Sequence, residues 1–174
     1  MRYKVLKEQF ISRDCMVCGN HNRLSLRARF FECEDAQGEK VLITVAKPKW
    51  NHQSYPDRMH GGVVSAILDE SIGRAVQMTH PEIWGVTIDL TVKFRSATPL
   101  SKKLFVKSKI TEVGSRAFLG EGELFVKGGE KPLATASGRF FLIPDTKLDS
   151  VGMGCLDEEN WHPSGLKLPK YIEF

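Results

Sequence analysis

The chain has 174 residues, of which 41% are hydrophobic and 26% are charged, values typical of one globular domain with a sizeable core. The net charge is +4, and because lysine and arginine are spread along the chain, we expect an anionic small ligand and no nucleic-acid partner. No apolar run is long enough to cross a bilayer, and the N-terminus lacks the apolar core of a signal peptide, so we expect a cytoplasmic protein without a membrane partner.

The N-terminal lead-in, residues 1–23, contains a C-x-x-C motif. Cys15 and Cys18 have the spacing of half a zinc site, and His21 could add a third ligand. No second C-x-x-C or H-x-x-H pair follows at a suitable distance, so we expect no bound metal and free thiols throughout. The alternative is a zinc-bearing module that binds nucleic acid, which would need a second ligand pair.

Residues 24–143 read as one domain of strands around a single helix. The alternating run 24–31 and the β-branched run 41–45 flank a turn at 35–38, which predicts a hairpin. Apolar residues at helical spacing predict one long helix that starts at Gly61 and continues to Val76. Four further strands are predicted at 85–94, 103–112, 116–127 and 133–143.

This order of elements favours an α+β fold. Consecutive strands with short turns predict an antiparallel sheet, and the single helix is left to fill its concave face. The tail, residues 144–174, is rich in Gly, Pro and charge, and we expect an irregular C-terminal extension packed on the surface or on a partner subunit.

The segment HGGVVSAILDE, residues 60–70, carries the candidate site. Glycines at the start of a helix leave backbone N–H groups open, and open N–H groups attract negative charge. Gly62, Ala66, Asp69 and Gly73 fall on one line of the helix, so the acid has only small neighbours. Glu70 differs from Asp69 because Arg74, four residues on, is suitably placed to pair with it.

These residues carry a resemblance to a known family. The HGG entry to a helix with an aspartate on it, the preceding HQSYP, Thr87 and the strand DLTVKF resemble the hotdog-fold acyl-CoA thioesterases of the phenylacetate-degradation and 4-hydroxybenzoyl-CoA type. The lead-in with C-x-x-C-G, Asn22 and LSLRARFF is also similar to theirs, although a glycine is usual at the position of Ser25. The resemblance spans roughly residues 15–143. It implies one long central helix wrapped by a curved antiparallel sheet, and subunits joined edge to edge into a homodimer or a dimer of dimers.

The resemblance also implies residue roles for acyl-CoA hydrolysis. Asp69 would be the nucleophile or the general base, and the N–H of Gly61 would polarise the thioester carbonyl. His60 would hold the loop or contact the carbonyl region. Gln53 would orient the water, with Asn51 as the other candidate. The chemistry is consistent, because preformed N–H donors stabilise the charge that develops on the carbonyl oxygen, and a carboxylate can attack or deprotonate water.

Substrate binding is assigned more loosely. The small residues beside the acid, Gly62, Ala66 and Gly73, would leave room for the substrate. A basic rim would hold the phosphates of coenzyme A, with candidates Lys93, Arg95, Lys102, Lys103 and Arg116. No cofactor is expected beyond the coenzyme A of the substrate itself. The alternative within the same fold is an acyl-CoA-binding hotdog protein without catalysis, whereas a dehydratase is disfavoured because the HGG entry is the thioesterase-like one.

Overall fold

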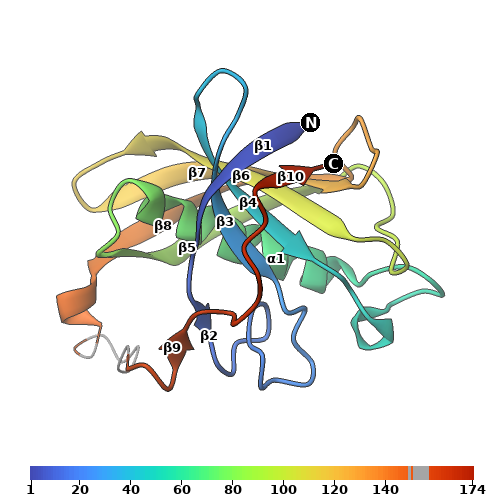
Figure 1. Cartoon of the computed structure of the whole chain (residues 1–174), viewed down its shortest axis with the longest axis horizontal. Helices are drawn as coiled ribbons and strands as arrows, with labels where there is room; N and C mark the ends of the chain where they lie inside the picture. Colours follow the sequence, from blue (N-terminus) through green and yellow to red (C-terminus); the bar gives the residue numbers. More distant parts are fainter. Residues whose placement is uncertain (149, 151–156) are drawn as a thin grey trace.

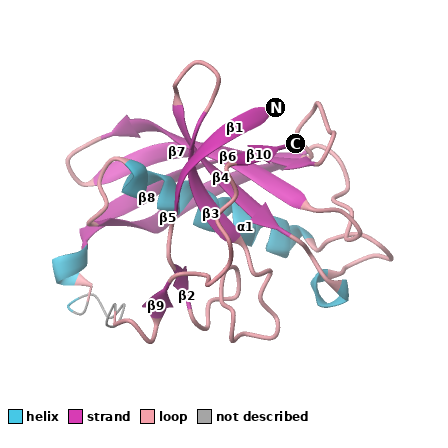
Figure 2. Ribbon diagram, viewed as in Figure 1, coloured by secondary structure: helices cyan, strands magenta, loops and turns pink. Residues whose placement is uncertain are grey.

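The structure is a computed structural model that describes residues 1–148, 150 and 157–174. A long helix lies against a large curved sheet, and a small second sheet sits beside it (Figures 1 and 2). The helix α1 spans Gly61–Arg74, and the strands are β1 Arg2–Glu8, β2 Ile11–Ser12, β3 Arg29–Glu34, β4 Lys40–Ala46, β5 Ile83–Phe94, β6 Leu104–Val113, β7 Ala117–Val126, β8 Ala134–Pro144, β9 Trp161–His162 and β10 Tyr171–Glu173. Short 3₁₀ helices cover Trp50–His52, Ala75–Met78 and Asp145–Lys147. The predicted α+β class is confirmed. No described helix is both long and apolar enough to cross a membrane.

The eight-stranded sheet has the order β10-β1-β3-β4-β6-β7-β8-β5, and all its pairings are antiparallel. The two strands that flank the helix in sequence, β4 and β5, are therefore separated by three others. The helix packs on one face of the sheet and contacts β4 to β8. This arrangement leaves β5 at an edge of the sheet, beside the helix.

The apolar residues at helical spacing form one buried face of the helix, as the sequence predicts. Val64 is 1% exposed, and Leu68, Ile72 and Ala75 are fully buried. These side chains pack with phenylalanines of β7 and β8 in the main core, where Phe118 and Phe140 stack with ring centroids 5.0 Å apart. Burial of aliphatic side chains at this spacing stabilises the helix more than its own propensity does.

The first predicted strand is displaced. The hairpin of β3 and β4 is confirmed, but β3 begins at Arg29 and not at residue 24. Residues 24–28 form an irregular segment in which the N–H of Arg27 donates to the hydroxyl of Ser25 (2.9 Å), and Arg27 has a φ of 51°. Leu26 is buried there without being in a strand. The alternation of apolar residues in this part of the run 24–31 therefore reflects burial by neighbouring segments and not sheet pairing.

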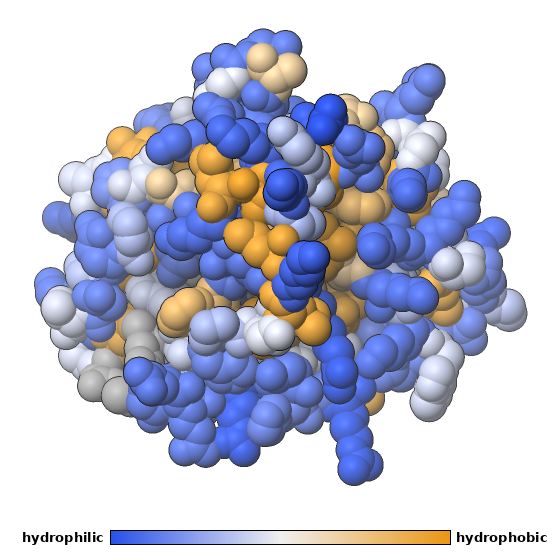
Figure 3. Space-filling model, viewed as in Figure 1, coloured by the Kyte–Doolittle hydropathy of each residue, from blue (hydrophilic) through white to orange (hydrophobic). Residues whose placement is uncertain are grey.

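The lead-in and the tail both contribute strands to the sheets. β1 pairs with β3, and β10 pairs with β1, so the two ends of the chain extend the main sheet. Phe174 stacks on Tyr3 and Phe105 in a second core on the face of the sheet that is turned away from the helix. The surface in this view is mostly hydrophilic, with apolar side chains collected near its middle (Figure 3). The description of the tail as irregular is therefore wrong for β9 and β10.

Candidate active site

Asp69 lies on the side of α1 that faces β5. Its Oδ1 accepts a hydrogen bond of 2.8 Å from the Thr87 hydroxyl, and the side chain is half-buried. Burial raises the pKa of the Asp69 carboxyl above its ordinary value, the Thr87 hydrogen bond opposes this rise, and the charge of Glu70 adds to it. Asp69 is thus an acid held in a fixed orientation and partly removed from water.

A β-bulge in β5 brings Thr87 to this acid. Leu90 and Val92 pack on the core side of the strand, so strict alternation would turn Thr87 away from the helix. The register shifts between Thr87 and Asp89, which places the extra residue at Ile88. Because of this extra residue, the Thr87 side chain points towards α1. Bulges often re-aim a side chain next to a functional site.

Asp69 borders a cavity of about 500 Å³. α1 contributes Asp69, Glu70 and Gly73 to its lining, and β5 contributes Trp84 and Thr87. The remaining walls include Ser12 and Cys15 of the lead-in and Asn160 and Trp161 of the tail. The pairing of β2 with β9 brings these two segments together. The lead-in and the tail, which sequence analysis did not assign to the site, therefore close the cavity.

The N-terminus of α1 has one open donor. His60 caps the helix, because its Nδ1 accepts the N–H of Gly62 (2.9 Å) and its own N–H donates to the carbonyl of His52 (2.8 Å). The N–H of Gly61 has no hydrogen-bond partner among the described residues. Of the glycine pair, Gly61 is therefore the one with an N–H available to a ligand. His60 therefore holds the loop at the start of the helix, and its contact with the carbonyl region of the substrate stays a prediction.

The loop before the helix uses its polar side chains internally. Gln53 is exposed, and its Oε1 accepts the N–H of Asp57 (3.0 Å). Asn51 donates to the carbonyl of Arg23 (3.4 Å), and its Oδ1 is buried without a partner in the described chain. Both residues lie at the N-terminal end of α1, away from the cavity at Asp69. Their role in orienting water stays a prediction.

A single chain does not bring the acid and the open donor together. Gly61 and Asp69 are eight residues apart on the helix, which is about 12 Å along its axis. Asp69 lines the cavity described above, whereas Gly61 lines a different hollow with Phe94 and Arg95. Within one chain, therefore, the acid and the open N–H line different hollows.

The small residues beside Asp69 have separate environments. Only Gly73 lines the cavity, and neither Gly62 nor Ala66 does. A Cβ built on Gly85 would lie 2.7 Å from the carbonyl oxygen of Gly73, so this part of the helix approaches β5 at backbone distance. This close approach requires a glycine at 85, whereas a Cβ on Gly73 itself would lie 3.3 Å from the Phe140 ring, and the role of Gly73 beside a ligand stays a prediction.

The basic candidates do not form one rim within the chain. Lys93 and Arg95 share a hollow of about 330 Å³ with Lys107 and Lys109 on the face of the sheet turned away from α1. Lys102 and Lys103 precede β6 at the same end of the sheet, whereas Arg116 lies in the turn between β6 and β7 at the other end. A strand as long as β7 separates the two ends by about 30 Å. The Asp69 cavity lies at the same end of the sheet as Arg116. The carbonyl of Arg116 accepts the N–H of Leu142 there.

Comparison with known proteins assigns the fold. Residues 57–133 match the model of the thioesterase superfamily. The structure resembles zebra fish Thioesterase Superfamily Member 2, with 15% identity, a TM-score of 0.58, and coverage of 67% of this chain and 81% of that one. It also resembles a hypothetical thioesterase from Streptococcus pneumoniae TIGR4 crystallised with coenzyme A, with 16% identity, a TM-score of 0.57, and coverage of 67% and 89%. The same streptococcal protein has been solved with one aspartate, and separately with one threonine, replaced by alanine.

The fold is therefore the hotdog fold, and the segment 57–133 matches the thioesterase superfamily. The resemblance stated from the sequence is confirmed at this level, and the phenylacetate or 4-hydroxybenzoyl subtype stays a prediction. A protein of Schizosaccharomyces pombe of uncharacterised function is 27% identical over 130 residues, which are 74% of this chain and 73% of that protein.

Proposed function

We propose that the protein hydrolyses acyl-CoA thioesters to a free acid and coenzyme A, with Asp69 as the nucleophile or general base. The superfamily match supports thioester hydrolysis in general. The observation that carries the proposal is the half-buried Asp69 carboxylate, held by Thr87 at the wall of a 500 Å³ cavity. The streptococcal relative was crystallised with coenzyme A, which supports this substrate class.

The carboxylate can serve the reaction in two ways. It can attack the thioester carbonyl and form a mixed anhydride, or it can take a proton from water as that water attacks. In both cases the hydrogen bond from Thr87 fixes which oxygen faces the substrate. Burial keeps the carboxylate poorly solvated, which strengthens it as a base.

The polarising donor is supplied across a subunit interface. Asp69 accepts a hydrogen bond from Thr87 in the N-terminal half of β5. Gly61 lies against Phe94 at the C-terminal end of β5, because a Cβ added to Gly61 would be 3.5 Å from the Phe94 ring. An antiparallel pairing of two β5 edges places the C-terminal half of one strand against the N-terminal half of the other. The twofold therefore brings Gly61 of the partner subunit towards Asp69.

The same twofold would assemble the basic residues. Lys93 and Arg95 lie near the C-terminal end of β5, so those of the partner subunit come to the end of the strand where Asp69 and Arg116 are found, on the face of the sheet turned away from α1. The expected rim for the coenzyme A phosphates is then composite. The free edge of β5, with Ile88 37% and Phe94 56% exposed, is the surface on which this dimer would form.

A thiol-release assay over aromatic, short, medium and long acyl-CoAs tests the function. Asp69→Asn and Asp69→Ala are expected to lower turnover by roughly a hundredfold or more while the variants stay folded and keep the oligomeric state of the parent. Binding of acyl-CoA without thiol release by the parent protein would instead identify a non-catalytic binding protein. Unchanged turnover in both variants would remove Asp69 from the mechanism.

A further inference from the structure

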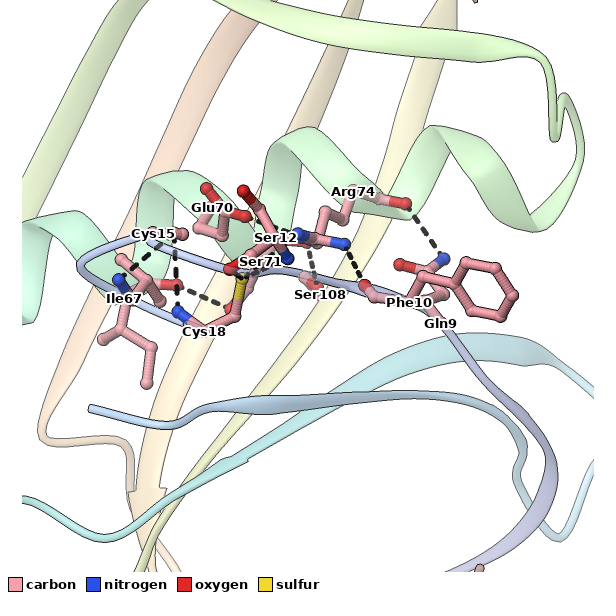
Figure 4. A network of polar contacts seen from close by, with 11 residues as sticks. Gln9, Phe10, Ser12, Cys15, Cys18, Ile67, Glu70, Ser71, Arg74 and Ser108 are labelled. Carbon is pink, nitrogen blue, oxygen red and sulfur yellow. Dashed lines mark hydrogen bonds and ion pairs between the residues drawn. The ribbon is translucent and has the colours of Figure 1, made fainter. Parts of the chain in front are cut away.

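Two cysteines of the lead-in meet the central helix at the cavity wall. The Sγ atoms of Cys15 and Cys18 and a carboxylate oxygen of Glu70 all lie within 4.8 Å of one another (Figure 4). The reaction proposed above uses none of these three groups. They come from segments far apart in sequence, and the fold brings their ligand atoms to one point.

The turn around the cysteines directs donors at both sulfurs. Cys15 Sγ accepts the N–H groups of Val17 (3.2 Å) and Cys18 (3.4 Å), and Cys18 Sγ accepts the N–H of Ser12 (3.4 Å). The turn closes tightly at Gly19, where a Cβ would lie 2.6 Å from the carbonyl oxygen of Cys15. Donors aimed at sulfur stabilise a thiolate, which is the metal-binding form of cysteine.

The acidity of the thiols is consistent with this geometry. A hydrogen bond from Cys18, supported by the backbone donors, lowers the pKa of Cys15 to about 7. The same hydrogen bond and burial raise the pKa of Cys18. Metal binding releases the proton of a cysteine, because the thiolate is the form that binds the ion.

Charge balance favours a divalent cation. Arg74 is 6% exposed, and its guanidinium lies between the rings of Phe30 and Trp161. It donates to Glu70 Oε1 (2.7 Å) and to Cys18 Sγ (3.4 Å). Two thiolates and a carboxylate carry three negative charges, of which Arg74 balances one. A doubly charged ion balances the other two, and buried charges are stable only when they are compensated in this way.

The distances suit zinc. Bonds of about 2.3 Å to sulfur and 2.1 Å to oxygen in a tetrahedron separate the ligand atoms by about 3.6–3.8 Å, so a closure of roughly 1 Å is sufficient. Arg74 occupies Oε1 of Glu70 and leaves the other carboxylate oxygen for an ion. Cys15 and Glu70 line the cavity, whereas Cys18 is buried behind them.

We propose that Cys15, Cys18 and Glu70 bind a zinc ion in the cavity wall, with its fourth coordination position open to the cavity. This differs from the expectation of no metal, and from the alternative in which His21 is the third ligand. The Nδ1 of His21 instead accepts the Arg13 Nε–H (3.1 Å) on the exposed side of the turn. The proposal does not depend on thioester hydrolysis, since it concerns metal content alone.

The test measures zinc in untagged protein purified without chelator. Inductively coupled plasma mass spectrometry should find about one zinc per chain in the parent, in Cys33→Ser and in His21→Ala. Cys33 is a matched control because it is a buried cysteine of β3 outside the cluster. The double variant Cys15→Ser/Cys18→Ser should lose the zinc, and Glu70→Gln should retain much less.

Cobalt provides a second readout on the parent chain, which avoids variants that fail to fold. Replacement of zinc by Co²⁺ should give sulfur-to-cobalt charge-transfer absorption and the intense visible bands of tetrahedral coordination. Folded parent protein without zinc that develops no such bands with Co²⁺ would overturn the proposal. So would a Cys15–Cys18 disulfide in freshly purified protein, or unchanged zinc in the double cysteine variant.

Discussion

At the scale of single residues, the site depends on one contact between an acid and a hydroxyl. The sequence pattern placed Asp69 on a helix and beside small residues, and both points are correct. The Thr87 hydrogen bond could not be derived from that pattern, because strict alternation along β5 turns Thr87 the wrong way. The shift at Ile88, visible only in the strand register, makes the contact.

Replacing the Thr87 hydroxyl tests this contact. We expect Thr87→Val to lower kcat/KM by about ten- to a hundredfold, since a hydrogen bond to a charged group contributes about 1.5–3 kcal/mol. The measurement is steady-state thiol release with the best acyl-CoA. Thr91→Val is the matched control, because Thr91 belongs to the same strand but lines the hollow on the opposite face of the sheet. Equal losses in the two variants would point to damage of β5 as a whole.

The two adjacent acids, Asp69 and Glu70, have different partners. Glu70 was expected to pair with Arg74, and the pair is present at 2.7 Å. The chain spacing of four residues was enough to predict it. That Glu70 also meets two thiols follows from the path of the lead-in over the helix, which no local pattern encodes.

At the scale of elements, the helix is the best-predicted part of the fold. Its buried stripe repeats at 3.6 residues over nearly four turns, and this signal depends only on the helix itself. The start of the strand predicted at 24–31 was wrong, because apolar and polar residues can alternate by chance over a few positions of a buried irregular segment. Strand boundaries depend on partners, and β3 starts where pairing with β4 starts.

The start of α1 allows a backbone N–H to be deleted without breaking the helix. Gly61→Pro removes that N–H at the first helical position, where proline is well tolerated. His60 has φ −64° and ψ 135°, the extended conformation that a residue before proline requires. We expect turnover to fall by about a hundredfold with the fold retained, because one oxyanion donor is lost.

Gly61→Ala is the control for this substitution. It retains the N–H, and its Cβ would lie 3.5 Å from Phe94, an ordinary contact distance. Activity close to that of the parent is therefore expected, as measured by thiol release beside circular dichroism for the fold. Full activity in folded Gly61→Pro would show that this N–H does not polarise the carbonyl.

At the scale of the whole molecule, the proposed site is shared between two subunits. Asp69→Asn and Gly61→Pro would each disable every site in a homodimer. When the two variants are co-expressed, half of the randomly paired dimers are mixed, and each mixed dimer has one site with both groups intact. We expect recovery of about a quarter of the parent activity from inactive variants.

Co-expression of Asp69→Asn with Asp69→Ala is the matched control and should recover nothing, since no pairing restores the acid. A different affinity tag on each variant, with purification on both tags in sequence, establishes that mixed dimers have formed. Mixed dimers without recovered activity would place both groups in one chain and contradict the composite site.

Local sequence patterns were enough to predict the helix, its buried face, the α+β class and the acid that the helix carries. Each of these depends on residues a few positions apart, whose periodicity and size are written in the chain. The partners of that acid follow from the folded chain. The edge position of β5, the bulge at Ile88, the lead-in and tail that close the cavity, and the three ligand atoms beside it all arise from contacts between distant segments. Such contacts are selected by the packing of the whole core, and a local pattern carries no information about which distant segment will be adjacent.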